Sequence, residues 1–184
     1  ETQPLTRCAA LCLCHDDVVV GGPTAAALWE LPGYSLGDEV SALAPPGRRP
    51  CAADWLNLFH TEPPHRDEVV MRADGINLTS PPRTTVDLAR FVPPGRLEPL
   101  IERLLHRHCG EAVLRQVAER YRSRGRPWVG GLLEFIDARG GVAPTESTGE
   151  LKVFHALRRR GVEGLVRQHR IELPGYGPAR FDLA

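Results

Sequence analysis

The stretch from residue 78 to residue 89 reads Leu78-Thr79-Ser80-Pro81-Pro82-Arg83-Thr84-Thr85-Val86-Asp87-Leu88-Ala89. Its first residues close an apolar extension, and Ser80 then suits the N-cap of a helix whose first turn tolerates the two prolines. The stretch therefore predicts a strand that ends and a helix that begins within a few residues, the helix running from Thr84 to Phe91. Arg83 and Asp87 are four residues apart on this helix, so their side chains can pair. We expect this pair to hold the helix against a sheet.

The residues before this stretch predict most of that sheet. Short apolar runs bounded by Gly, Pro and Asp indicate strands at 18–20, 39–44, 55–60, 68–72 and 76–78. Two helices are expected as well, one at 5–14 and one at 23–30, and Pro23 suits the first position of the second. We therefore predict a small mixed α/β domain over residues 1–95.

After Pro93-Pro94-Gly95 the apolar residues recur at helical spacing. The first helical face comprises Leu97, Leu100, Ile101, Leu104 and Leu105. Further faces follow around 113–121 and 132–136, whereas Gly130-Gly131 and Gly140-Gly141 are expected to form turns. His106 and His108 are two residues apart, which is no helical metal spacing, so we expect them at the surface. These features predict a helical connector over residues 96–142.

The last part of the chain, residues 143–184, predicts one helix followed by two strands. The helix is expected at about 146–160 and the strands at 167–175 and 179–184. Ser147 and Glu150 have the spacing of a capping box at the helix start. Because helices and strands are segregated along the chain in this way, the expected fold class is α+β.

Charge is distributed unevenly along the 184 residues, although the formal net charge is zero. Residues 1–100 carry 8 basic and 13 acidic side chains (−5), whereas residues 101–170 carry 14 basic and 8 acidic ones (+6). The basic segment either faces phosphate or consists of solvated arginine-rich helix faces, and both interpretations stay open. No apolar run approaches 18 residues, so we expect no membrane span and no membrane partner.

The five cysteines are expected to be free thiols. An odd number without a secretory leader favours a reducing compartment, and we expect a cytoplasmic protein. Cys8, Cys12, Cys14 and His15 lie close together, but they lack the usual CxxC pair and a second half-site for zinc. We therefore interpret these cysteines as small core residues.

Three stretches, taken in order, carry a resemblance to a known family. They are Pro23 to Leu31 (PTAAALWEL), Leu78 to Ala89, and Glu146-Ser147 through Phe181-Asp182-Leu183-Ala184. With them the chain resembles actinobacterial proteins related to the AbiEi antitoxins of type IV toxin–antitoxin systems. Many of these proteins carry a Vsr-like, restriction-endonuclease-like domain at the C-terminus. The resemblance places Thr24, Arg83, Thr84 and Asp87 in the family signature, with a structural role.

The resemblance implies a function in binding. In this family a winged helix-turn-helix binds DNA and represses the operon, and the following domain counters a nucleotidyltransferase-like toxin. No unit of three short helices and a basic hairpin precedes Pro23, so we expect this chain to hold the second part. The expected function is an AbiEi-like antitoxin or regulatory component of a toxin–antitoxin or defence locus. Its expected partners are a nucleotidyltransferase-like toxin and DNA.

Two alternatives follow from the third stretch, because the resemblance makes residues 143–184 part of a restriction-endonuclease-like domain. Such domains supply a helix glutamate and an aspartate at a strand end, and Glu146 and Asp182 match these positions as catalytic and metal-binding candidates. The first alternative is a truncated Mg²⁺-dependent, Vsr-like DNA endonuclease, in which Arg158-Arg159-Arg160 contacts the phosphate backbone. The following strand with its Glu-x-Lys-like pair is not matched, so activity in this form is not expected. The second alternative is a decayed nuclease fold that serves as an interaction module.

Overall fold

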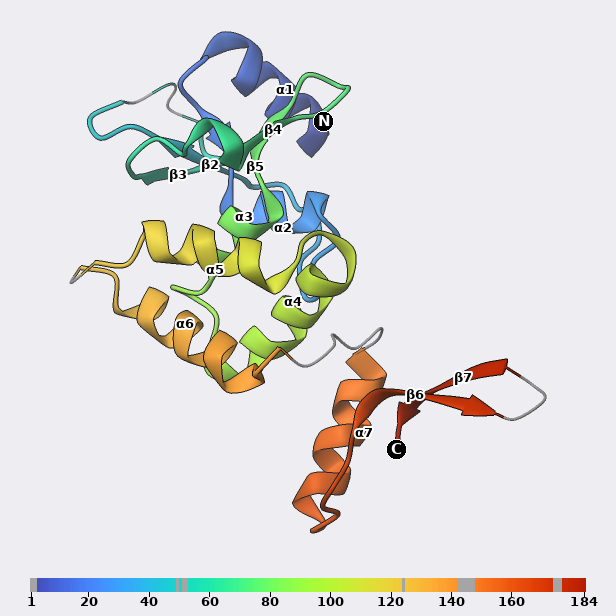
Figure 1. The fold of residues 1–184 in the computed structure, drawn as a ribbon. Coiled ribbons are helices and arrows are strands. Elements are labelled where there is room, and N and C mark those ends of the chain that lie inside the picture. Colours follow the sequence, from blue (N-terminus) through green and yellow to red (C-terminus); the bar gives the residue numbers. More distant parts are fainter. Residues whose placement is uncertain (1–2, 49, 51–52, 124, 142–147, 174–176) are drawn as a thin grey trace.

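A computed structural model describes residues 3–48, 50, 53–123, 125–141, 148–173 and 177–184 (Figure 1). These residues form seven α-helices, a five-stranded mixed sheet and a separate two-stranded sheet. The expected α+β class is therefore confirmed. No helix in the described part of the chain has both the length and the apolar character needed to cross a bilayer.

The five-stranded sheet has the order β3-β2-β1-β5-β4. Its strands are β1 (Val19–Val20), β2 (Val40–Ala44), β3 (Leu56–His60), β4 (Val69–Met71) and β5 (Asn77–Thr79). β1 pairs antiparallel with β2 and parallel with β5, while β2–β3 is parallel and β4–β5 antiparallel. Every residue of β2 is buried, which fits a strand covered on both faces. All five strands lie within the ranges that the sequence predicts, or within one residue of them.

Helices cover both faces of this sheet. In Figure 1, α1 (Pro4–Cys14) lies above the sheet, whereas α2 (Gly22–Leu28) and α3 (Pro81–Leu88) lie below it. α1 contributes Cys8, Leu11 and Cys12 to the core against the strands. α3 begins at Pro81 and ends at Leu88, earlier than predicted at both ends, because the two prolines already belong to its first turn. Ser80 occupies the N-cap as expected, but its side chain makes no capping hydrogen bond.

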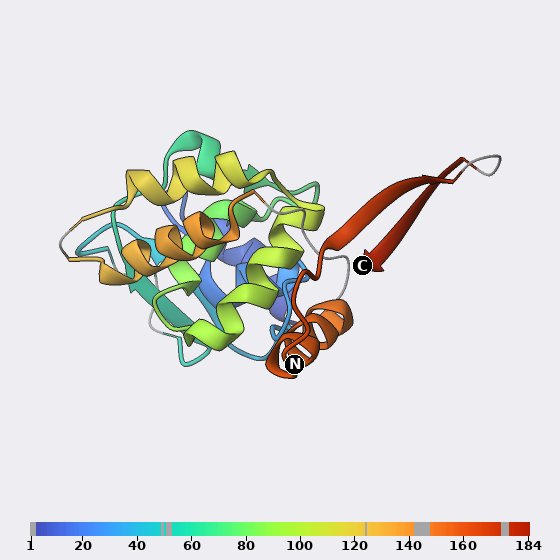
Figure 2. The same cartoon turned by 60° about the horizontal axis from the view of Figure 1, so that its bottom comes forward.

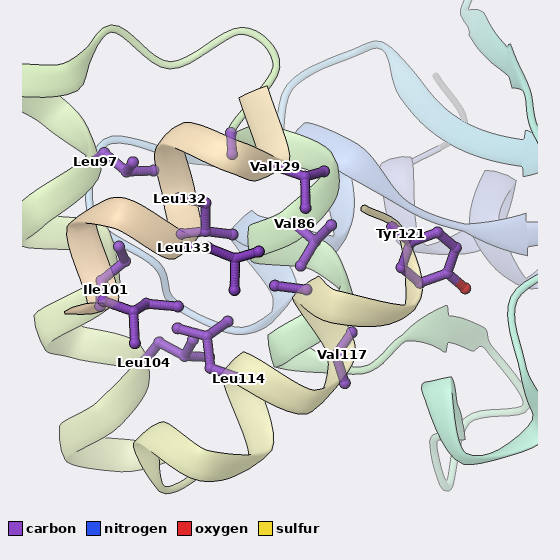
Figure 3. Close-up of a cluster of buried hydrophobic side chains, with 13 residues drawn as sticks. Val86, Leu97, Ile101, Leu104, Leu114, Val117, Tyr121, Val129, Leu132 and Leu133 are labelled. Carbon is purple, nitrogen blue, oxygen red and sulfur yellow. The ribbon is translucent and has the colours of Figure 1, made fainter. Parts of the chain in front are cut away.

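The next three helices pack beneath α3. They are α4 (Pro94–Arg107), α5 (Glu111–Arg120) and α6 (Pro127–Arg139). Figure 3 shows their apolar side chains converging, among them Ile101, Leu114 and Leu132, together with Val86 of α3. One core therefore joins α3 to the helical connector. The expectation of a turn at Gly130-Gly131 is wrong, because packing of α6 carries the helix through both glycines; Gly140 does end it, in the left-handed conformation.

The C-terminal part comprises α7 (Thr148–Arg159) and the antiparallel pair β6 (Arg167–Leu173) and β7 (Gly177–Leu183). Figures 1 and 2 show the β6–β7 hairpin extending away from the rest of the molecule. Gln168 adopts the left-handed conformation (φ 54°), which is unusual for a residue other than glycine. Its side-chain Nε2 donates to Glu150 Oε2 at 3.0 Å and so ties β6 to α7. Ser147, the other residue of the predicted capping box, lies outside the described residues.

The close approach between β1 and β2 generates a stability prediction at Gly21. A Cβ atom at Gly21 would lie 2.7 Å from Cγ of Leu43, whereas one at Gly130 in α6 would meet nothing within 4 Å. We expect Gly21→Ala to lower the free energy of unfolding by about 1–3 kcal/mol through overpacking. Gly130→Ala is the matched control and should raise it by about 0.5–1 kcal/mol through helix propensity. Urea denaturation of both variants measures this, and a neutral Gly21→Ala would contradict the packing described.

Candidate functional site

A buried carboxylate, Glu68, lies where the chain enters β4, and it is completely shielded from solvent. Arg83 of α3 lies beside it with Nη1 3.3 Å from Glu68 Oε2, and its own side chain is 1% exposed. The Nε of Arg83 also donates to both oxygens of Asp87, at 3.0 and 2.9 Å. The Arg83–Asp87 pair expected from the sequence is therefore confirmed, and it extends to a third group, Glu68, on the edge of the sheet.

The end of α5 completes this network from the other side. The Tyr121 hydroxyl donates to Glu68 Oε2, and the Arg83 Cζ lies 4.0 Å from the centroid of the Tyr121 ring. Arg120 Nη1 donates to Glu68 Oε1 at 3.0 Å and reaches Asp67 Oδ2 at 2.7 Å. The network, defined as Asp67, Glu68, Arg83, Asp87, Arg120 and Tyr121, thus connects the start of β4 with α3 and α5.

Burial sets the electrostatics of the network. Removal from water raises the pKa of the Asp87 carboxyl, and this effect outweighs the opposing attraction of Arg83. Desolvation, supported by the hydrogen bond to Glu68, also raises the pKa of the Tyr121 hydroxyl and keeps it protonated as a donor. The buried groups of the network, Glu68, Arg83 and Tyr121, thus each have a partner, as burial requires.

Thr24 and Thr84, which the sequence resemblance also singles out, have structural roles as well. The buried Thr24 Oγ1 accepts a hydrogen bond from the Ser41 amide at 2.8 Å, which ties α2 to β2. Thr84 Oγ1 lies 2.7 Å from Thr79 Oγ1 and donates to the Thr79 carbonyl at 3.1 Å, which ties α3 to β5. Thr24, Arg83 and Thr84 therefore fasten helices to the sheet, and Asp87 pairs with Arg83 within α3.

A cleft of about 190 Å³ opens beside the network, between the ends of β2 and β3 and the helices α3, α5 and α6. Its lining includes Asp87, Arg90, Tyr121, Arg126 and Trp128. The Arg90 guanidinium lies 5.3 Å from the Phe91 ring centroid and 5.2 Å from that of Trp128. Arg126 lies 5.2 Å from the Tyr121 ring centroid. We call this the aromatic cleft; sequence reasoning missed it because its walls come from four separate segments.

A second cleft of about 560 Å³ lies where the C-terminal part meets the helical connector. Behind it, the nearly buried Glu102 carboxylate lies 3.1 Å from Arg139 Nη2 and 3.3 Å from Arg167 Nη1. Nearby, His155 Nε2 of α7 lies 2.7 Å from Glu98 Oε2 of α4. The ion pairs of Glu102 attach β6 to the helical connector, and the His155–Glu98 hydrogen bond attaches α7 to it.

Of the two acids predicted for nuclease chemistry, Asp182 lies within the described residues. Asp182 is exposed on β7, so no burial cost requires a partner for it. Glu146 lies outside the described residues. Across the described residues, no group of three or more His, Cys, Asp or Glu side chains is arranged to hold a metal ion. Arg158, Arg159 and Arg160 are exposed at the end of α7, and the Arg158 Cζ lies 5.8 Å from the Phe154 ring centroid.

The described cysteines are free thiols, and two of those near the N-terminus belong to the core. Cys8 is fully buried, and desolvation raises the pKa of its thiol to about 11. The Cys12 Sγ lies 3.6 Å from the Asn77 carbonyl oxygen, as a weak donor. Cys14, by contrast, is exposed at the end of α1. The interpretation of the cysteines as core residues is therefore confirmed for Cys8 and Cys12 and wrong for Cys14.

His108 does not lie freely at the surface as expected. It is half-buried at the end of α4, with Nε2 3.1 Å from the Trp29 carbonyl oxygen. Its ring also contacts the Trp29 ring edge-on, with centroids 5.7 Å apart. Desolvation lowers the pKa of His108. The histidine therefore fastens α4 to the end of α2.

Comparison with known proteins gives a likeness of fold. No family model matches the chain, and no curated protein matches it. Among solved structures it is similar to the crystal structure of the RV2827C protein from Mycobacterium tuberculosis, with 17% sequence identity and a TM-score of 0.53. The similarity covers 95% of this chain and 66% of the RV2827C chain. This chain therefore spans just under two thirds of the length of RV2827C. At this identity the likeness concerns the fold alone.

Removing the central cation of the network tests its structural role. We expect Arg83→Met to lower the free energy of unfolding by about 3–5 kcal/mol, because it leaves the half-buried Asp87 without its cation and leaves the fully buried Glu68 with Arg120 as its remaining cation. The matched control is Arg115→Met, which breaks the exposed Arg115–Asp137 pair (2.6 Å) and should cost at most about 1 kcal/mol. Equal effects of the two substitutions in urea denaturation would refute the role assigned to Arg83.

Proposed function

We propose that this chain is an AbiEi-like antitoxin or regulatory component of a toxin–antitoxin or defence locus, and that it acts by binding a nucleotidyltransferase-like toxin. The observation that carries the proposal is that the residues of the expected family signature make their contacts within the protein. Thr24, Arg83 and Thr84 direct their polar groups at other elements of the fold, and Asp87 holds Arg83 in place within α3. Because these residues stabilise the fold, they support a function in which the protein presents a fixed surface to a partner.

The C-terminal part supplies a surface suited to such a partner. Four large apolar side chains are exposed in α7, the turn after it and the hairpin: Val153, Val162, Val166 and Phe181. The cations Arg158, Arg159 and Arg160 are exposed in the same part. Apolar side chains beside arginines are the composition enriched at protein–protein interfaces. This composition supports a toxin surface that is apolar with an acidic rim.

The C-terminal part is attached to the helical connector, so it needs little further ordering when it binds a partner. The buried charges of Glu102, Arg139 and Arg167 fix β6 to the helical connector, and the contact between His155 and Glu98 fixes α7 to it. A surface that is already ordered loses little conformational entropy on association. This geometry supports a preorganised interface on α7 and the hairpin.

Co-expression with the nucleotidyltransferase-like protein of the same locus tests the proposal. We expect the two proteins to co-elute as a complex in size-exclusion chromatography with light scattering, and growth to be restored when both are expressed. A double variant, Arg159→Glu with Phe181→Ser, should weaken the complex by about tenfold or more, since it removes an apolar contact and inverts a charge.

The control for this experiment is Leu13→Ser. Leu13 is the most exposed of the large apolar side chains, at 79%, but it lies on α1. Its substitution should leave the affinity unchanged. Absence of both a complex and growth rescue with the wild-type chain would overturn the proposed function.

A second candidate function is a Mg²⁺-dependent DNA endonuclease of Vsr-like type, and the order of elements after residue 148 favours it. α7 is followed by the antiparallel β6–β7 pair and is joined to β6 by the Glu150–Gln168 hydrogen bond. This is the helix–strand–strand order that the resemblance implies. In that function Glu146 and Asp182 hold the metal, and Arg158, Arg159 and Arg160 contact DNA phosphates. If Glu146 and Asp182 have no catalytic role, the same fold serves as an interaction module.

Calorimetric titration with Mn²⁺ separates these alternatives. The nuclease function predicts a binding heat that is lost in both Glu146→Gln and Asp182→Asn, because two carboxylates are the least that holds such an ion. Asp54→Asn, which changes an exposed acid in the segment before β3, is the control and should retain the heat. No heat with the wild-type chain would exclude the metal site and leave the interaction module.

A further inference from the structure

The aromatic cleft has the composition of a ligand site, and the proposed function does not use it. Rings of Phe59, Phe91, Tyr121 and Trp128 contribute to its lining. The Phe59 and Phe91 rings pack with centroids 5.7 Å apart at 44°, and Tyr121 is fixed by its hydrogen bond to Glu68. Aromatic walls held in place in this way favour a planar ring, which stacks on their faces.

Two arginines at this cleft are available to an anion. Among the described residues no carboxylate pairs with Arg90, which is exposed and contacts only ring faces. Arg126 has a long contact of 3.7 Å to Glu62, whose side chain is 77% exposed. A contact this long to a solvent-exposed carboxylate contributes at most about 1 kcal/mol, so an incoming phosphate can replace Glu62. The cleft also borders the first turn of α6, where the helix dipole adds to the attraction.

Among the residues that line the cleft, Asp87 supplies the carboxylate beside these cations. Asp87 is 23% exposed, and Arg83 Nε occupies one side of its carboxylate. A carboxylate has about four lone-pair positions, so Asp87 can still accept a hydrogen bond from a base amino or imino group. The proximity of Arg83 offsets the negative charge there. The remaining titratable groups of the lining are His60 and Tyr121.

We propose that the aromatic cleft binds one nucleotide, with its base stacked on the rings and facing Asp87, and with its phosphate at Arg90 and Arg126. The volume of about 190 Å³ is below the roughly 300 Å³ at which sites enclosing a drug-sized ligand begin. The cleft therefore suits one base, with the sugar and phosphate at its mouth. Both a free nucleotide and one nucleotide of a single-stranded nucleic acid have this chemistry.

The test measures quenching of tryptophan fluorescence in the full chain, because Trp128 lines the cleft. The probes are AMP, GMP, CMP and UMP, the matching nucleosides, inorganic phosphate, and single-stranded oligodeoxynucleotides of mixed sequence. We expect saturable binding of at least one nucleotide, at least tenfold weaker binding of its nucleoside, and weaker binding at higher salt. Equal affinity for the mononucleotide and the oligonucleotide assigns a free nucleotide, whereas tighter binding of the oligonucleotide assigns a strand.

Variants of exposed arginines make the test specific. Arg90→Gln should weaken binding about tenfold or more without lowering the melting temperature, and Arg90→Lys should not restore it fully, because lysine stacks poorly. Arg48→Gln, which removes the exposed Arg48–Asp17 pair at 2.8 Å, is the control and should bind normally. The proposal is overturned if no nucleotide or oligonucleotide quenches the fluorescence, or if Arg90→Gln and Arg48→Gln bind equally well. Neither result depends on the toxin complex.

Discussion

One carboxylate, that of Glu68, determines how the sheet and the helices of this protein fit together. It has no contact with water, and it is held by Arg83, Tyr121 and Arg120. A buried charge is tolerated only where partners surround it, so the positions of α3 and α5 relative to β4 are narrowly constrained. Apolar packing alone would permit several arrangements of these helices, and the network distinguishes one of them.

The same constraint shapes the surface beside it. Arg83 and Tyr121, which hold Glu68, also fix Asp87 and one wall of the aromatic cleft. A second ionic cluster around Glu102 has the corresponding role for α7 and β6. The interior charges of the protein thus serve as fasteners, while its exposed arginines, such as Arg90 and Arg159, stay available to partners. This division of roles unites the two proposals, one for a protein surface and one for a nucleotide.

The sequence predicts what depends on neighbouring residues and misses what depends on distant ones. Short apolar runs bounded by turn residues indicated all five strands of the main sheet. The four-residue separation of Arg83 and Asp87 on a helix indicated their pair. Glu68 has one local partner in the His65 amide, but its side-chain partners are 15, 52 and 53 residues away, so no local pattern reveals the network. The helix through Gly130 was missed since tertiary packing overrides the poor helix propensity of glycine. Exposure of Asp182 follows from how the hairpin extends, which no pattern in β7 reveals.

The residues of the network are far apart in the sequence, which affects how the protein folds while it is being synthesised. Glu68 leaves the ribosome well before Arg120 and Tyr121, so the edge of the sheet has an incompletely partnered carboxylate until α5 has been made. The last strand of the sheet, β5, ends at Thr79, yet the interior beneath it closes only about forty residues later. A nascent chain released or cleaved in this interval would expose a half-formed sheet edge, the kind of surface that aggregates.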